Sequence, residues 1–331
     1  MIDQELNGLE KTQEIYTEPG APPRPGRNKN LAIKALVLLL IFIFGGGGGY
    51  MLGSRFGHND RSSLSSQKRI DAMSLMRQIN PAQGYEIKAA VGDVGMQLVS
   101  AGAIDLARFA GLYKQQNKPL TDLQMNILTK DTIVDVVINP DNAYFWLNFF
   151  WALGLTNQNE ILTNGPMMAA GKEKVGNFAS TGGWTLGTRK ATDLYSSQKI
   201  IQLTAEQQSR LLEVASGVYR PCCNNPTHFP DCNHGMAMLG LLELMASQGA
   251  DVNQMFEAAK YVTAFWYPQQ ILEVATFFKV GNDMDFALVD GRTVLSSQYS
   301  SISGYQAVHQ WLSQNGLLEQ APGSGGSCGV G

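Results

Sequence analysis

The segment Tyr144-Phe145-Trp146-Leu147-Asn148-Phe149-Phe150-Trp151 decides the fold, because aromatic side chains fill most of its positions. Asp141 and Asn142 precede it, and both residue types favour the start of a helix. A helix that carries aromatic side chains all round must be buried on most sides. We therefore predict a central core helix here, in preference to a cofactor-binding motif.

Helical signals also dominate on both sides of this segment. Before it, Ile70, Met73, Met76 and Ile79 recur at helix spacing. Further helix starts and spans are predicted at 85–101, at 104–115, after Thr121, after the capping box Thr204–Gln207 and after the similar pair Asp251–Gln254.

Strand signals are few by comparison. The β-branched run 132–138 fits a strand or a helix equally well. We therefore predict an all-α, multi-helix domain.

Two stretches of the domain resemble each other. Residues 98–114 contain Gly102-Ala103 before Asp105, and residues 244–261 contain Gly249-Ala250 before Asp251. Paired-helix repeats, stacked as helical hairpins, would account for this similarity.

Composition excludes some functional classes. Hydrophobic residues make up 44% of the 331 residues, charged residues make up 16%, and the formal net charge is −3. No basic stripe of the kind that nucleic-acid binding requires is present. We therefore expect no nucleic-acid partner and a domain with a sizeable core.

An uncharged apolar run, Ala35 to Ser54, lies near the N-terminus. Its length matches the roughly 30 Å of a bilayer's hydrocarbon core. A cleaved signal peptide is the alternative, but the preceding region is long for one and no A-x-A-like site follows. The predicted organisation is a disordered tail (1–30), a transmembrane helix (31–54), a linker (55–66), a helical domain (67–318) and a flexible Gly/Ser tail (319–331).

The charges beside this run indicate its orientation. Basic residues lie closer to it on the N-terminal side, which favours a cytoplasmic N-terminus and an extracytoplasmic C-terminal domain. Gly45 to Gly49 could let two such helices approach each other, so self-association or another protein partner is compatible with the sequence. The only N-x-[ST]-like triplet, Asn225-Pro226-Thr227, is blocked by proline, which weakly favours a bacterial envelope.

Cysteine and histidine concentrate in one short segment. Most of the cysteines and half of the histidines lie between residues 222 and 234, among prolines that stiffen the chain: Cys222, Cys223, His228, Cys232 and His234. Thiolate and imidazole groups are ligands of soft or borderline metals, so a Zn or Cu site is one hypothesis. The spacing matches no standard zinc finger, and Met236 is more typical of a helix core than of a copper site.

The same residues support two other hypotheses. Cys222 or Cys223 could form a disulfide with Cys232, and the remaining cysteine could pair with Cys328 in the C-terminal tail. Alternatively, that tail could present Cys328 to the metal as a fourth sulfur. Cys232 also precedes a predicted helix, whose N-terminus would stabilise a reactive thiolate.

A glycine-rich stretch, 165–190, predicts a long loop. Its Thr181, Gly182, Gly183 and Arg189 make a weak candidate for anion binding through backbone N–H groups. No hydrolase, zinc-protease or nucleotide-binding motif is present, so the sequence assigns no catalytic residue.

These observations favour a single-pass, membrane-anchored extracytoplasmic protein whose Cys/His loop binds a metal ion or performs thiol-redox chemistry. The alternative is a structural or interaction protein of the cell envelope, with the same loop crosslinked by disulfides and without catalysis.

Overall fold

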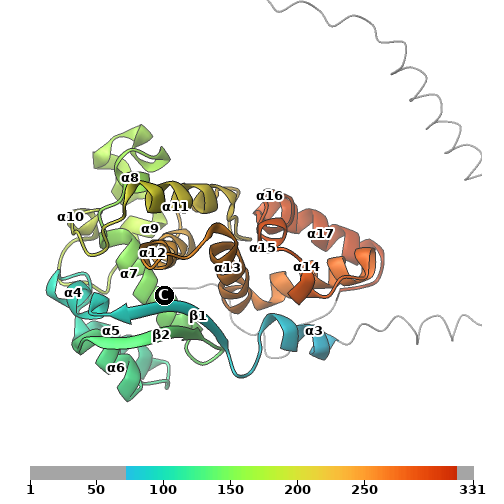
Figure 1. Cartoon of the computed structure of the whole chain (residues 1–331), viewed down its shortest axis with the longest axis horizontal. Helices are drawn as coiled ribbons and strands as arrows, with labels where there is room; N and C mark the ends of the chain where they lie inside the picture. Colours follow the sequence, from blue (N-terminus) through green and yellow to red (C-terminus); the bar gives the residue numbers. More distant parts are fainter. Residues whose placement is uncertain (1–71, 319–331) are drawn as a thin grey trace, which may run out of the picture. The chain divides into compact units, whose positions relative to one another are not determined.

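The computed structural model describes residues 72–318, and these residues form a mostly helical unit with one small sheet (Figure 1). The elements follow in chain order: α3 (Ala72–Ile79), β1 (Tyr85–Gly92), α4 (Val94–Ser100), α5 (Leu106–Gln115), α6 (Asp122–Thr129), β2 (Thr132–Ile138), α7 (Ala143–Thr156), α8 (Glu160–Thr163), η1 (Pro166–Ala170), η2 (Lys172–Asn177), α9 (Ala179–Gly182), α10 (Ala191–Leu194), α11 (Ala205–Gly217), α12 (Asn233–Ser247), α13 (Val252–Trp266), α14 (Pro268–Asn282), η3 (Phe286–Leu288), α15 (Gly291–Val294), α16 (Ser297–Ser300) and α17 (Ile302–Gln314).

The aromatic helix α7 lies in the centre of the larger hydrophobic core, as the sequence predicts. It packs against α12, which is buried along nearly its whole length. The two backbones approach so closely that a Cβ on Gly154 would lie 2.0 Å from the Met236 carbonyl oxygen, and one on Gly240 would lie 2.4 Å from that of Phe150. Glycine at both positions therefore permits this helix crossing.

The sheet is antiparallel and has two strands, with Tyr85 opposite Ile138 and Gly92 opposite Thr132. Residues 132–138, whose sequence fits a strand or a helix equally well, form strand β2. The predicted helix over 85–101 is wrong in its first half, because Tyr85–Gly92 is strand β1 and only Val94–Ser100 is helical. Side chains of β1 alternate between buried and more exposed, and the pairing with β2 provides hydrogen bonds that an isolated segment lacks. The all-α class therefore holds for most of the described chain but not for this sheet.

The outer edge of β1 is covered by a side chain from α12's C-terminal end. The Gln248 amide accepts a hydrogen bond from the Ala90 backbone N–H at 2.8 Å and donates one to the Ala90 carbonyl at 2.7 Å. This double contact replaces the backbone pairing of a further strand. It also attaches the sheet to α12, the helix whose N-cap is Cys232.

Helix starts agree well with the sequence. The predicted helix over 104–115 is confirmed as α5, and Thr121, Thr204 and Asp251 each cap a helix and form a capping box. The similarity between residues 98–114 and 244–261 corresponds to a shared turn. Gly102 and Gly249 both have positive φ, and the residue after each donates to a carbonyl five positions earlier.

The flanking helices of these two turns differ in length. They span 7 and 10 residues around Gly102, but 15 and 15 around Gly249. The similarity therefore reflects a common way to end one helix and begin the next.

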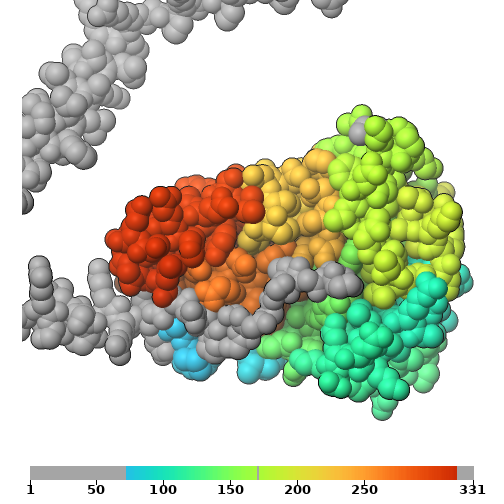
Figure 2. Space-filling model, turned by 180° about the vertical axis from the view of Figure 1, so that it is seen from behind, coloured from blue at the N-terminus to red at the C-terminus, as the bar shows by residue number. Residues whose placement is uncertain are grey.

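A smaller hydrophobic cluster joins α3 to α14 and α17. Figure 2, drawn from behind, shows the helices α14–α17 at one end of the described part, in orange and red, and α4–α6 at the other in cyan and green. Helix α13 lies between the two clusters and contributes residues to both.

The predicted transmembrane helix (31–54) and its flanking tail and linker lie outside the described residues, as does the predicted C-terminal tail (319–331). Within residues 72–318, no helix combines the length and the apolar character that are needed to cross a bilayer.

Candidate metal centre

The cysteine loop, which we define as residues 218–234, connects α11 to α12. Backbone hydrogen bonds tie the middle of the loop to the C-terminal end of α11, from the Thr227 N–H to the Val218 carbonyl at 2.9 Å and from the His228 N–H to the Ala215 carbonyl at 2.9 Å. The Ile302 N–H donates to the Cys223 carbonyl at 2.9 Å, which ties the loop to the start of α17. The loop is therefore fixed on both sides by helical elements.

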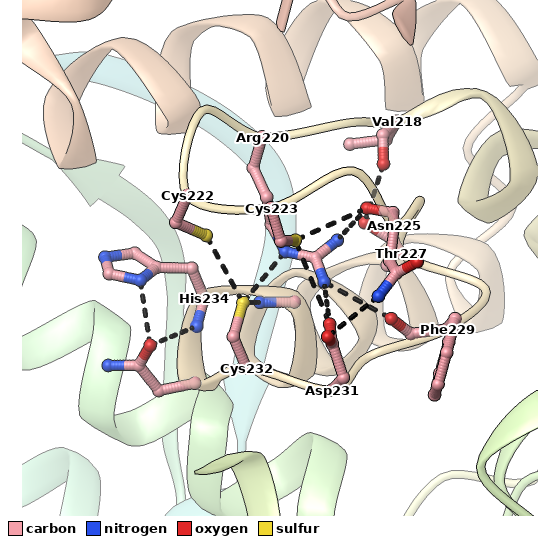
Figure 3. A network of polar contacts seen from close by, with 12 residues as sticks. Val218, Arg220, Cys222, Cys223, Asn225, Thr227, Phe229, Asp231, Cys232 and His234 are labelled. Carbon is pink, nitrogen blue, oxygen red and sulfur yellow. Dashed lines mark hydrogen bonds and ion pairs between the residues drawn. The ribbon is translucent and has the colours of Figure 1, made fainter. Parts of the chain in front are cut away.

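Arg220 is the centre of the loop, and only 2% of its surface is exposed. Its guanidinium donates to the Asn225 and Phe229 carbonyls at 3.0 and 3.3 Å, to the Asp231 carboxylate at 3.0 Å and to Cys232 Sγ at 3.0 Å (Figure 3). Hydrogen bonds that involve a charged group contribute about 1.5–3 kcal/mol each. One buried side chain thus determines the path of the whole loop.

Gly235, in the first turn of α12, makes room for this guanidinium. A Cβ at that position would lie 2.3 Å from Arg220 Nη2. The helix can therefore begin directly beside the buried charge.

The three described cysteines meet beside Arg220. The sulfur atoms of Cys222, Cys223 and Cys232 all lie within 4.8 Å of one another, and the Cys222 and Cys232 sulfurs are 3.4 Å apart. In the part of the chain that the structure describes, this is the one group of three or more Cys, His, Asp or Glu side chains close enough to share a metal ion. The cysteine cluster predicted from the sequence is therefore brought together in space.

Cys232 is the most acidic of the three thiols. It is the N-cap of α12, as the sequence predicts, and its sulfur accepts a hydrogen bond from the Gly235 N–H at 3.4 Å. Hydrogen bonds from Cys222 and Cys223, followed by the charge of Arg220, hold the pKa of the Cys232 thiol well below its ordinary value. Hydrogen bonds with Cys223 and Cys232, followed by burial, raise the pKa of Cys222, so a proton is held on that sulfur when Cys232 is a thiolate in the metal-free protein.

Asp231 supports the cluster from the other side. Its carboxylate accepts hydrogen bonds from Arg220 and, at 2.8 Å, from the Asn225 amide. Cys223 Sγ lies 3.8 Å from the same carboxylate and 3.7 Å from the Asn225 carbonyl oxygen. Cys223 thus lies beside a carboxylate and a backbone carbonyl.

The two histidines predicted as ligands do not join the sulfur atoms. His234 Nδ1 lies 2.9 Å from the Asn233 side-chain oxygen, and its ring packs on Tyr267 with centroids 4.5 Å apart. Burial lowers the pKa of His234 to about 4, so it is neutral at physiological pH. His228 lines a separate pocket with Glu160 and Leu212. Neither imidazole belongs to the sulfur group, and Met236 is buried in the core.

Tyr267 is a neighbour of the site that sequence reasoning missed. It is 2% exposed. Burial raises its pKa, and the charges of Cys222 and Cys232 raise it further, which places the phenol beside the sulfur atoms. Arg220 and Asp231 were also missed, although both lie inside the cysteine-rich segment.

The predicted disulfides do not form among the described cysteines, because Cys222, Cys223 and Cys232 are free thiols. Cys328 lies outside the described residues. Its pairing, and its role as a fourth sulfur ligand, stay predictions.

The anion-binding loop also stays a prediction. Thr181 and Gly182 belong to the short helix α9, and the Thr181 side chain is buried. The Arg189 guanidinium donates to the Ala101 and Asp193 carbonyls at 3.4 and 2.9 Å. Gly183 packs so tightly that a Cβ there would lie 2.4 Å from the Ala179 carbonyl oxygen. Packing within the fold therefore accounts for much of this glycine-rich stretch.

Three thiols with a neighbouring guanidinium can perform two kinds of chemistry. They can bind a soft metal ion as thiolates, and they can exchange electrons through disulfide formation. Comparison with protein-family models, with curated proteins and with solved structures finds no match to this chain, so the site itself carries the functional argument.

Proposed function

We propose that the cysteine loop binds one thiophilic metal ion, Zn²⁺ or Cu⁺, through Cys222, Cys223 and Cys232. The observation that carries this proposal is the approach of the three sulfur atoms to within 4.8 Å of one another. Of the metals common in proteins, these two accept an all-thiolate environment most readily.

The sulfur spacing supports such a site. A Zn–S distance of about 2.3 Å in tetrahedral geometry places two sulfur ligands roughly 3.8 Å apart. The 3.4 Å separation of Cys222 and Cys232 and the 4.8 Å limit for the group bracket this value. Small side-chain rotations suffice to close the three sulfurs around one ion.

The charges around the site support it as well. Three thiolates and a divalent ion carry a net charge of −1, which the buried Arg220 guanidinium offsets. Its hydrogen bond to Cys232 Sγ also orients this sulfur, as outer-shell donors do at known metal sites. With three protein ligands, zinc would keep one coordination position for water or an exogenous ligand.

The test is elemental analysis of the full chain, purified in detergent under reducing conditions. We expect close to one ion per chain and, after exchange with Co²⁺, a thiolate-to-cobalt charge-transfer absorption. Cys222→Ser, Cys223→Ser and Cys232→Ser should each lose the ion, because each removes one of the three sulfur ligands that the described structure brings together.

His228→Ala is the matched control, because His228 lies in the same loop but faces another pocket. This variant should retain the ion. A wild-type chain with no more metal than Cys232→Ser would contradict the proposal and favour an envelope interaction protein.

We also propose that the loop lies outside the cytoplasm, on a domain tethered by residues 31–54. The apolar run and its flanking basic residues support this placement. In spheroplasts of a bacterial host, a membrane-impermeant maleimide should label Cys222 once the metal has been removed. Labelling only after lysis would contradict the proposed orientation.

A further inference from the structure

The three sulfurs of the site are not equivalent. Cys222 and Cys232 point toward each other, with their sulfur atoms 3.4 Å apart (Figure 3). Cys223 instead lies beside the Asp231 carboxylate and the Asn225 carbonyl, at 3.8 and 3.7 Å. The structure thus places the Cys222 and Cys232 sulfurs in direct contact and gives Cys223 two oxygen neighbours.

The pair is accessible from one side and supported from the other. Cys222 is an exposed residue, whereas Cys232 is half-buried. Cys232 Sγ accepts hydrogen bonds from Arg220 Nε at 3.0 Å and from the Gly235 N–H at 3.4 Å. These donors stabilise negative charge on Cys232, which suits a sulfur that attacks its partner and later leaves it.

We infer that a hydroperoxide oxidises Cys222 and Cys232 to a reversible disulfide, and that this oxidation releases the metal ion. This inference rests on the proposed metal site, and it assigns that site a redox control. Cys223 takes no part in the crosslink.

The chemistry balances in two steps. As a metal ligand Cys222 is a thiolate, and it attacks one hydroperoxide oxygen. The O–O bond breaks, one proton is taken up, and Cys222 becomes a sulfenic acid while water or an alcohol departs. The Cys232 thiolate then attacks the Cys222 sulfur, and hydroxide leaves as the S–S bond forms. With H₂O₂ as oxidant, two thiolates and two protons yield one disulfide and two water molecules.

Oxidation removes two of the three sulfur ligands. The ion is left with Cys223 alone and dissociates, because a disulfide sulfur is a poor ligand compared with a thiolate. A dithiol reductant restores the site by exchange through a mixed disulfide.

The experiment treats the metal-loaded full chain with one equivalent of H₂O₂ in the presence of a chromophoric chelator. We expect the ion to appear in solution together with a mass loss of two hydrogens per chain. Non-reducing peptide mapping should show a crosslink between the peptides that contain Cys222 and Cys232. Dithiothreitol should reverse both changes and allow the ion to rebind.

Cys222 and Cys223 are adjacent in sequence, so peptide mapping alone cannot tell which of them is crosslinked to Cys232. Two variants identify this partner. Cys223→Ser should still form the crosslink, whereas Cys222→Ser should not. The opposite result, or a crosslink to Cys328, would overturn the inference.

The two proposals fail in different ways. If the untreated chain contains no metal, the proposed function is overturned. Peptide mapping then still tests whether Cys222 and Cys232 form the disulfide. A chain that binds metal but forms no 222–232 crosslink, or that keeps its ion after crosslinking, overturns the inference and leaves the metal site intact.

Discussion

The α7–α12 helix pair and the cysteine loop are held together by opposite means. The helix pair is apolar over nearly its whole surface, and its geometry depends on Gly154 and Gly240 at the crossing. The cysteine loop has few apolar side chains, and its path follows the hydrogen bonds of Arg220. Both meet at the first turn of α12.

The difference shows how the cysteine loop is positioned by the apolar α7–α12 core. The core positions the N-terminus of α12, and that terminus then positions Cys232. The buried arginine holds the rest of the loop against it. Changes in the helix pair should therefore affect the whole fold, whereas changes in the loop should affect the site first.

The largest expected effect is at the helix crossing. Gly154→Ala places a Cβ 2.0 Å from the Met236 carbonyl oxygen, so the two helices must separate. We expect a loss of about 3 kcal/mol in the free energy of unfolding, typical of overpacking against backbone. Denaturant titration followed by circular dichroism measures this loss.

Gly281→Ala is the matched control for this substitution. Gly281 lies in helix α14, and a Cβ there would meet nothing within 4 Å. This variant should gain about 0.5–1 kcal/mol, because alanine is the better helix former. Equal destabilisation by the two changes would show that the crossing is not tight.

An intermediate effect is expected in the loop. Arg220→Lys keeps the charge but cannot reach the four acceptors of the guanidinium. We expect a loss of about 2 kcal/mol in the metal-free protein, together with weaker metal binding. Denaturant titration and competition with a chelator measure the two effects.

Arg292→Lys provides the comparison, because Arg292 pairs with Glu213 at the surface, where its side chain is 50% exposed. It should change stability by no more than about 0.5 kcal/mol. Similar losses at Arg220 and Arg292 would refute the central role of Arg220.

The smallest effect concerns the one acidic side chain of α12. Glu243 is fully buried, with the Asn157 side chain beside it. Burial raises its pKa well above the ordinary value, so the folded protein retains a proton that the unfolded chain releases near pH 4.5. The native fold therefore loses stability as pH rises from this value toward the folded-state pKa.

Glu243→Gln removes this titration. Between pH 5 and pH 6 the variant should gain about 1 kcal/mol relative to the native protein. Parallel urea titrations at the two pH values measure this difference. If the difference in unfolding free energy between the two proteins is the same at both pH values, Glu243 is ionised in the folded protein.

Local sequence signals predicted the parts of the fold that depend on nearby residues. The buried aromatic helix, the helix starts at Thr121, Thr204 and Asp251, and Cys232 at the head of α12 all follow from spacing or capping chemistry. The strand at residues 85–92 escapes local prediction, because its partner strand lies forty or more positions away in the sequence. No local pattern could provide that pairing.

The sequence by itself determined that a helical core forms around residues 144–151 and that the cysteines lie in one stiff loop. Only the tertiary structure decided which side chains converge. It brought three sulfur atoms together, placed His234 on Tyr267 and His228 against another pocket, and buried Arg220 among the loop carbonyls. The physical reason is that burial and the hydrogen bonds it requires are set by neighbours distant in sequence, whereas spacing records only what lies close along the chain.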